Sequence, residues 1–181
     1  MAEIDRINDS LENFTVLKGS EVDIKPDGSL DLPDEVLAGL DIVVASVHTS
    51  LRQEPKVITQ RVLHALENEY VTILAHPTSR IISRRLPTLV DMDAVIASAV
   101  EHNKVLELNS YPDRLDMNDD NVRKTMDAGG MISIDTDAHS ASELAFMDFG
   151  VAVARRGWAT KGRVLNTMPY TELLSFLGGG L

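Results

Sequence analysis

The sequence of 181 residues predicts an α/β fold, a partial and distorted barrel built from successive βα units. Two observations support this fold class. Short apolar runs rich in β-branched residues alternate with segments that have the periodicity and capping residues of helices, as parallel βα units require. Only five or six such units are present, whereas a closed eight-stranded barrel typically needs about 250 residues. We therefore expect an incomplete barrel with its first strands absent, because an amphipathic helical pattern already begins at Ile4.

The predicted strands are the apolar runs. In chain order they are FTVLKGSEVDI (14–24), IVVASV (42–47), YVTILA (70–75), KVLELN (104–109), GMISIDT (130–136) and a sixth run, RVLNT (163–167).

Helix boundaries can be predicted from proline, glycine and capping residues between these runs. They are a start at Pro55, an N-cap at Asp91, a start near Asn118 with a stop at Gly129 and Gly130, a capping box from Ser140 to Glu143, and a start at Pro169. The terminal GGGL is expected to be a frayed tail.

Composition limits the class of protein. The chain has no apolar run near the about 20 residues of a membrane span, and its acidic, polar start is unlike a signal peptide. The sequence contains no cysteine, so any metal must be held by His, Asp or Glu. We therefore predict a cytoplasmic protein without a membrane partner, in which residues 1–181 form one domain.

The net charge of -11 argues against a broad nucleic-acid surface, because duplex binding relies on Lys and Arg. Local basic clusters stand out against this background: Arg80, Arg84 and Arg85 lie close together in the sequence. Solvated surface charge is the alternative interpretation of such a cluster.

Polar residues follow the predicted strands at their C-terminal ends, which meet at one face of a parallel sheet. They are Glu21, His48, His76, Asn109, Asp137 and His139. The two other histidines, His64 and His102, fall inside helical patterns. Imidazoles together with carboxylates suit zinc, manganese or iron, and two such ions about 4 Å apart can clamp a phosphoryl group. Glu21 is the natural bridging ligand. The alternative is a cofactor-free barrel in which these side chains line the rim.

Four segments in order, GSEVDI, ASVH, LAHP and DTDAH, resemble the PHP (polymerase and histidinol phosphatase) domain over nearly the whole chain. NSYPDRLDMND and ARRGW are also similar to the PHP domain at the C-terminus of bacterial and archaeal family X DNA polymerases. The resemblance implies a distorted seven-stranded (βα) barrel that hydrolyses phosphoesters with up to three metal ions. In the polymerase branch, which is associated with DNA repair, the activity is a manganese-dependent 3′-5′ exonuclease.

The resemblance also implies roles for residues. Glu21 would be the bridging ligand, His48 and His76 would complete one metal site, Asp137 would serve a second ion and His139 a third; all five would be catalytic. The family's opening HxH motif and two further ligands have no counterpart here. One site could therefore be intact, while the other two would each lack ligands.

Further residues are assigned by their predicted positions. The loops at the strand ends carry the candidate phosphate-binding residues Arg80, Arg84, Arg85 and Arg114, since guanidinium groups bind phosphate oxygens in pairs. Asn109 and Asn166 are predicted to fix loops, and Trp158 is predicted to pack in the core.

Three functional interpretations stay open. The chain is a phosphoesterase acting on nucleic acid 3′ ends or on a small phosphomonoester, or it is an incomplete PHP fragment that serves as a structural or partner-binding module. In the third, a homo-oligomer or a separate polypeptide supplies the missing strands. No polymerase active site is predicted.

Overall fold

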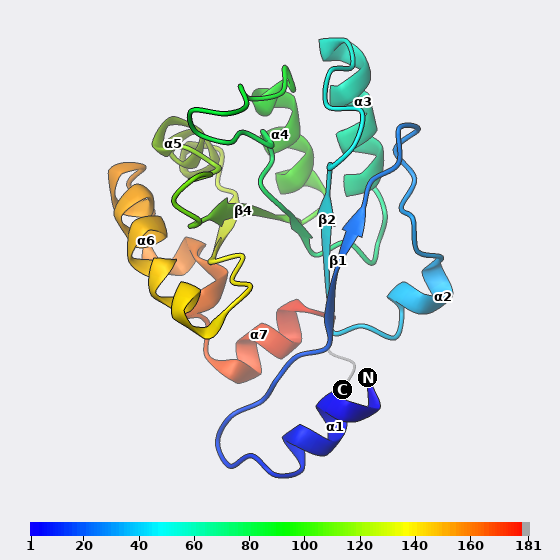
Figure 1. Cartoon of the computed structure of the whole chain (residues 1–181), viewed down its shortest axis with the longest axis vertical. Coiled ribbons are helices and arrows are strands. Elements are labelled where there is room, and N and C mark those ends of the chain that lie inside the picture. The colour runs from blue at the N-terminus through cyan, green and yellow to red at the C-terminus, as the bar shows by residue number, and fades with distance from the viewer. Residues whose placement is uncertain (179–181) are drawn as a thin grey trace.

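A computed structural model describes residues 1–178, so that residues 179–181 of the predicted GGGL tail lie outside the described part of the chain. Five parallel strands form one sheet in the order β1-β2-β3-β4-β5 (Figure 1). They are β1 (Gly19–Asp23), β2 (Ile42–Ser46), β3 (Ile73–Leu74), β4 (Val105–Asn109) and β5 (Met131–Asp135). The predicted α/β class is confirmed. Since every pairing is parallel, the five C-terminal strand ends lie along one edge of the sheet.

The described residues contain seven α-helices. They are α1 (Ala2–Asn8), α2 (Asp34–Leu37), α3 (Pro55–Leu66), α4 (Met92–Glu101), α5 (Asp119–Asp127), α6 (Met147–Arg156) and α7 (Tyr170–Phe176). Three 3₁₀ helices join them: η1 (Ala141–Phe146), η2 (Lys161–Arg163) and η3 (Leu165–Thr167). Helices α3 to α6 follow one another around the twisted sheet, and α1 lies apart from this body (Figure 1). Within residues 1–178, no helix has the length and apolar character needed to cross a membrane.

The two faces of the sheet have different coverings. Val43 and Ala45 of β2 belong to the main core, together with the apolar faces of α3 and α4. Ile42 and Val44 alternate with them and point to the opposite face, where residues of α7 pack. Glu21 pairs with Val44 across β1 and β2, so its side chain lies on this second face.

Several predicted helix boundaries are confirmed. Helix α3 begins at Pro55, and its predicted apolar face is buried. The Asp91 carboxylate accepts hydrogen bonds from the amides of the first turn of α4, and the Asn118 side chain caps α5 by accepting from Asn121 N at 2.9 Å. Helix α7 follows Pro169 directly. Helix α1 was also predicted, but none of its residues is buried.

The predicted sixth strand, RVLNT, is wrong. Val164 makes one isolated parallel bridge to Ile132, and η3 follows it. The Asn166 side chain explains this, because its amide bonds both the N–H and the C=O of Ile134, at 2.7 and 3.0 Å. These side-chain bonds occupy backbone groups at the edge of β5 that a sixth strand would use.

Two smaller predictions are also wrong. Ser140 makes no capping hydrogen bond to η1; instead, Glu143 accepts from the N–H of His139 at 2.6 Å. Trp158 is not in the core: it is 71% exposed, and the Arg123 guanidinium lies 4.8 Å from its ring centre. The backbone at Trp158 has a φ of 60° just after α6, so the chain turns there and the indole lies over α5.

Candidate metal centre

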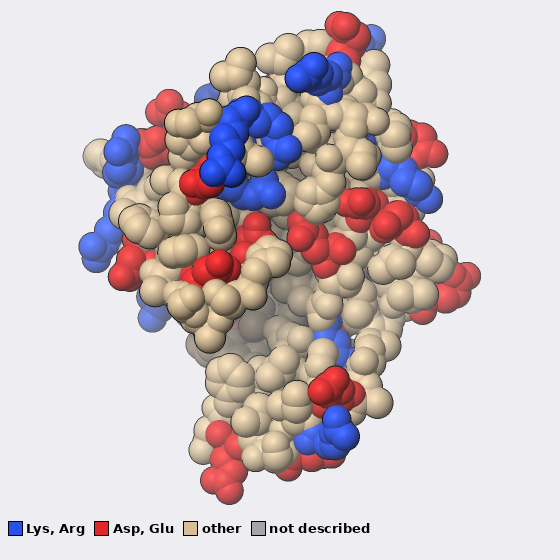
Figure 2. Space-filling view, viewed as in Figure 1, with Lys and Arg blue, Asp and Glu red and all other residues tan. Residues whose placement is uncertain are grey.

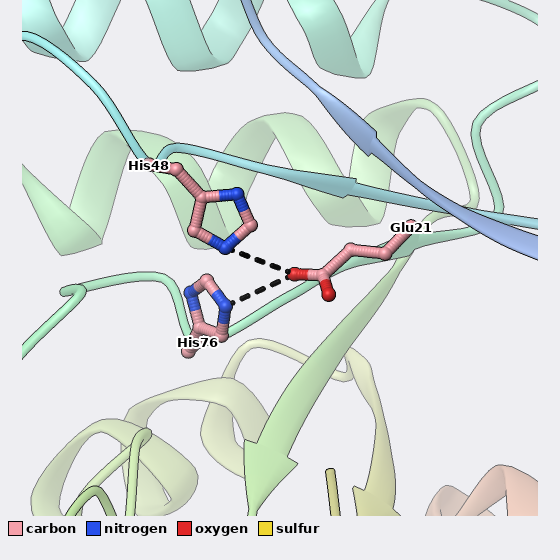
Figure 3. Close-up of side chains that lie close together, drawn as sticks. All are labelled: Glu21, His48 and His76. Carbon is pink, nitrogen blue, oxygen red and sulfur yellow. Dashed lines mark hydrogen bonds and ion pairs between the residues drawn. The ribbon is translucent and has the colours of Figure 1, made fainter. Parts of the chain in front are cut away.

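Three predicted ligands converge at the ends of three neighbouring strands. Glu21 lies within β1, and His48 and His76 lie two residues beyond β2 and β3. Glu21 Oε1 is 3.3 Å from His48 Nε2 and 3.1 Å from His76 Nε2 (Figure 3). One possible ligand atom from each of the three residues lies within 4.8 Å of the other two. Two imidazole nitrogens and a carboxylate oxygen match the ligand sets of zinc, manganese and iron, so these residues could hold a divalent metal ion.

The charges of the group are strongly coupled. Hydrogen bonds from His48 and His76 hold the pKa of Glu21 well below its usual range, despite partial burial. The same contact with Glu21, supported by Asp23, raises the pKa of His48 to about 8. In the metal-free protein, a proton on His48 therefore occupies the place at which a cation would bind Glu21.

Asp23 is a site residue that the sequence reasoning missed. Its Oδ1 lies 2.6 Å from His48 Nδ1, and Ser46 Oγ lies 3.3 Å from the same nitrogen. A proton held between Nδ1 and Asp23 leaves Nε2 of His48 directed at Glu21 as the metal-binding nitrogen. The signal was present in the sequence, because Asp23 stands two residues after Glu21 and shares its face of β1.

His76 is held in an unusual backbone conformation. Its φ is 26°, and its side chain is 2% exposed. The His76 N–H donates to Glu107 Oε2 at 2.5 Å, and Glu107 is itself only 5% exposed in the middle of β4. Burial, and then the nearby Asp135, raises the pKa of Glu107 well above its usual value. A side chain from the next strand thus fixes the main chain of a predicted ligand.

A second buried carboxyl group holds the loop that follows His76. Asp116 accepts hydrogen bonds from Thr78 N at 3.0 Å and from Thr78 Oγ1 at 2.9 Å. Burial raises the pKa of Asp116. Neither Glu107 nor Asp116 was identified from the sequence. Glu107 could have been noticed as the one charged residue inside the apolar run VLEL.

The other two predicted ligands lie in a different environment. Asp137 Oδ2 accepts from Asn109 Nδ2 at 3.2 Å and lies 3.5 Å from Arg114 Nε. The His139 side chain is 82% exposed, and its Nδ1 lies 2.8 Å from the carbonyl oxygen of Asp137. Among residues 1–178, only Glu21, His48 and His76 form a group of three or more potential ligands. Asp137 and His139 do not join it.

The predicted phosphate-binding arginines differ in how they are held. Arg80 donates through Nε to Arg114 O at 2.8 Å and through Nη2 to Leu115 O, so its guanidinium ties two loops together. Arg85 donates to Ser79 O at 2.7 Å. Arg84 is exposed, 3.7 Å from an Asp113 oxygen. Arg114 is mostly buried, and its Nη1 has no hydrogen-bond partner among the described residues.

Known proteins resemble this chain over most of its length. It is 45% identical over 175 residues to the DNA polymerase/3'-5' exonuclease PolX of Bacillus subtilis (strain 168), covering 97% of this chain and 31% of that protein. It is 30% identical over 169 residues to a probable phosphatase of Thermoanaerobacter sp. (strain X514), covering 88% of this chain and 66% of the relative. A probable phosphatase of Tolumonas auensis is 30% identical over 176 residues, covering 92% of this chain and 69% of that relative. No family model matches the chain.

Proposed function

Because the chain belongs to the PHP family, together with the PolX exonuclease and the probable phosphatases, we propose that it is a metal-dependent phosphoesterase. The main support for this proposal is that His48 and His76 both approach one carboxylate oxygen of Glu21. We further propose that residues 1–181 form one PHP-type domain, and that the five strands are part of a seven-stranded barrel whose first strands this sequence does not supply.

The three converging residues would hold one divalent ion, manganese, zinc or iron. Such an ion would polarise a phosphoryl oxygen and favour the ionisation of a water molecule. Asp23 keeps His48 in the tautomer that directs Nε2 at Glu21. Glu107 keeps the backbone of His76 in place. These residues prepare the ligand positions before an ion arrives, which lowers the cost of binding.

Asp137 and His139 are proposed ligands of further ions, which would need ligands beyond these two. Of the four arginines, Arg114 is the one that lies beside Asp137, and its Nη1 has no hydrogen-bond partner among the described residues; because this atom is buried, the guanidinium would have to turn outward to contact a phosphate there. Arg84 is exposed and can reach a ligand, whereas Arg80 and Arg85 are partly engaged by backbone carbonyls. We propose that Arg84 and Arg114 contribute most to phosphate binding, with Arg80 and Arg85 in supporting positions.

The substrate follows from the relatives in two ways. The PolX relative is named as a 3'-5' exonuclease, which favours nucleic acid 3′ ends. This chain covers 69% of the probable phosphatase of Tolumonas auensis but only 31% of the PolX relative. This favours a small phosphomonoester as the second candidate substrate. The PolX relative is much longer than this chain, so its polymerase activity is not proposed here.

The test combines metal content with activity. Elemental analysis of the purified chain is expected to find about one manganese, zinc or iron ion per molecule, as the single three-ligand group suggests. Manganese-dependent cleavage is then measured on a 3′-labelled single strand and on p-nitrophenyl phosphate. Cleavage of either supports the proposal. Bound metal without cleavage of either substrate would identify an incomplete PHP module that serves a structural or partner-binding role. Absence of bound metal would contradict the proposed site.

A further inference from the structure

A groove lies between the loop that follows β2 and the loop that follows β3. Its volume is about 560 Å³, within the range of about 300–1,000 Å³ that is typical of ligand pockets. Leu51–Pro55 line one wall, and Arg84–Leu89 line the other. His48 precedes the first wall in its loop, and His76 begins the connection that carries the second. Because Leu51 is three residues from His48, the chain places the start of the first wall within about 11 Å of that residue.

The lining of this groove combines apolar and basic side chains. Leu86 is 87% exposed and Leu89 is 68% exposed, although water contact disfavours large aliphatic side chains. The basic lining residues are Arg52, Arg84 and Arg85, and Glu54 is the one acidic residue of the lining. Basic side chains gather over the loop between β3 and α4, beside a cluster of acidic ones (Figure 2). In a chain of net charge -11, this lining favours an anionic ligand that also has an apolar part.

The exposed wall is held in a defined shape. Ile81 and Arg85 exchange two backbone hydrogen bonds, of 3.0 and 2.7 Å, which close a tight turn. Thr88 N donates to Thr78 O at 2.8 Å, and the Arg85 guanidinium is bonded to the carbonyl of Ser79. The leucines are thus presented by a loop tied to the residues that follow His76. A preformed wall reduces the ordering cost of binding.

We propose that this groove binds the nucleotides of a single strand next to the scissile phosphodiester, an inference that rests on the proposed phosphoesterase function. Nucleobases lie against Leu86 and Leu89, and backbone phosphates contact Arg52 and Arg84. A small phosphomonoester would end at the metal centre and leave the leucines exposed. In a duplex, the base faces are stacked on one another, so they are not free to pack against the leucines.

Binding without turnover tests the groove. Fluorescence anisotropy in EDTA compares a labelled single strand of about ten nucleotides, within known single-strand site sizes, with a labelled dinucleotide. The longer strand is expected to bind at least about tenfold more tightly. The double variant Leu86→Ser with Leu89→Ser should lose most of this difference, whereas Leu144→Ser, at another exposed leucine, in η1, should keep it. Arg52→Ala should lower the slope of log affinity against log salt by about 0.7, the value for one lost phosphate contact.

Three outcomes would overturn the groove assignment: equal affinity for the two ligands, unchanged affinity in the double leucine variant, or equally tight binding of a duplex of the same sequence. Because the leucines are exposed, the variants are expected to fold, and circular dichroism checks this. The binding data do not depend on catalysis. Failure to cleave p-nitrophenyl phosphate and the 3′-labelled strand with manganese would count against the proposed function, while a length-dependent, leucine-dependent affinity would still support the groove.

Discussion

The ends of β1, β2 and β3 differ from the end of β5, although the sequence predicts metal ligands at both. At the first region, two imidazoles approach one carboxylate oxygen of Glu21 at 3.1 and 3.3 Å. At the second, Asp137 is approached by an amide and a guanidinium, and His139 projects into solvent. The first arrangement brings two imidazole nitrogens and a carboxylate oxygen together where a metal ion could bind, whereas the second already contains a cation, Arg114.

Ligand type is therefore only part of what makes a metal site. Each histidine of the first region has a partner that fixes it: Asp23 holds the ring of His48, and Glu107 holds the backbone of His76. His139 has only local contacts with its own loop. A preorganised set of ligands is therefore confined to three adjacent strands.

Removing an imidazole of the first region should have the largest effect on manganese affinity. His48→Ala and His76→Ala each leave two of the three converging ligands, so manganese affinity should fall by more than the about 100-fold seen for supporting residues. Isothermal titration calorimetry of the metal-free variants measures this.

His64→Ala is the control for these substitutions. His64 lies on α3, where its Nδ1 is 3.1 Å from Asp27 O, and it is not part of the three-residue group. Its manganese affinity should equal that of the unmodified chain. If all three alanine variants lost the same affinity, the assignment of the site would be wrong.

Asp23→Asn tests the orienting residue alone. All three ligands remain, but the negative partner of His48 Nδ1 is lost, so manganese affinity should fall by about 10–100-fold. In the metal-free protein, the pKa of His48 should also fall from about 8, because Asp23 contributes to raising it. An NMR titration of the histidine ring signals measures this second effect.

The sign of the pH dependence follows from the raised pKa of His48. Contacts of the charged ring with Glu21 and Asp23 stabilise the folded metal-free protein fully below the ordinary value of 6.5, and this contribution is lost as pH rises through about 8. Asp23→Asn should therefore reduce stability below pH 6.5 more than above pH 8. A pKa of His48 that stayed near 8 in the variant would contradict this role of Asp23.

Glu107 can be tested by a matched pair of variants. Glu107→Ala removes the acceptor of the buried His76 N–H and should lower the free energy of unfolding by about 1–3 kcal/mol. Glu107→Gln keeps an oxygen acceptor of the same shape and should recover most of that loss. Urea unfolding gives the stability, and manganese titration shows whether His76 is still positioned. If both variants bound manganese as tightly as the unmodified chain, Glu107 would support only the fold.

The fold was largely predictable because its signals are local. Each strand within residues 1–178 begins inside a predicted apolar run, and proline, aspartate and asparagine mark helix starts where expected. The sixth predicted run failed for a reason that is not local: the Asn166 amide bonds the backbone of Ile134 in place of a strand. The apolar character of a segment does not reveal that one of its side chains will take the backbone hydrogen bonds that a neighbouring strand would otherwise make.

The converging ligands were predictable from their places after successive strands, since parallel topology brings strand ends together. The supporting residues left weaker signals. Asp23 stands two residues after Glu21, and Glu107 is the one charged residue of its apolar run, but their roles depend on distances to side chains and backbone groups of the neighbouring strands. Likewise, the sequence predicted Asp137 as a ligand of a second ion, and only the structure reveals its contacts with Asn109 and Arg114.

A substitution in the second region should change manganese affinity least. His139→Ala removes an exposed ring that does not reach the Glu21 group, so manganese affinity at that group should change by no more than about twofold, as expected for a surface substitution. The same titration used for His48→Ala measures it under identical conditions. A loss as large as that of His48→Ala would mean that His139 swings inward when metal binds, and the contrast between the two regions would then be a property of the metal-free protein alone. An unchanged affinity together with reduced phosphoester cleavage would instead place His139 at a separate step of the reaction.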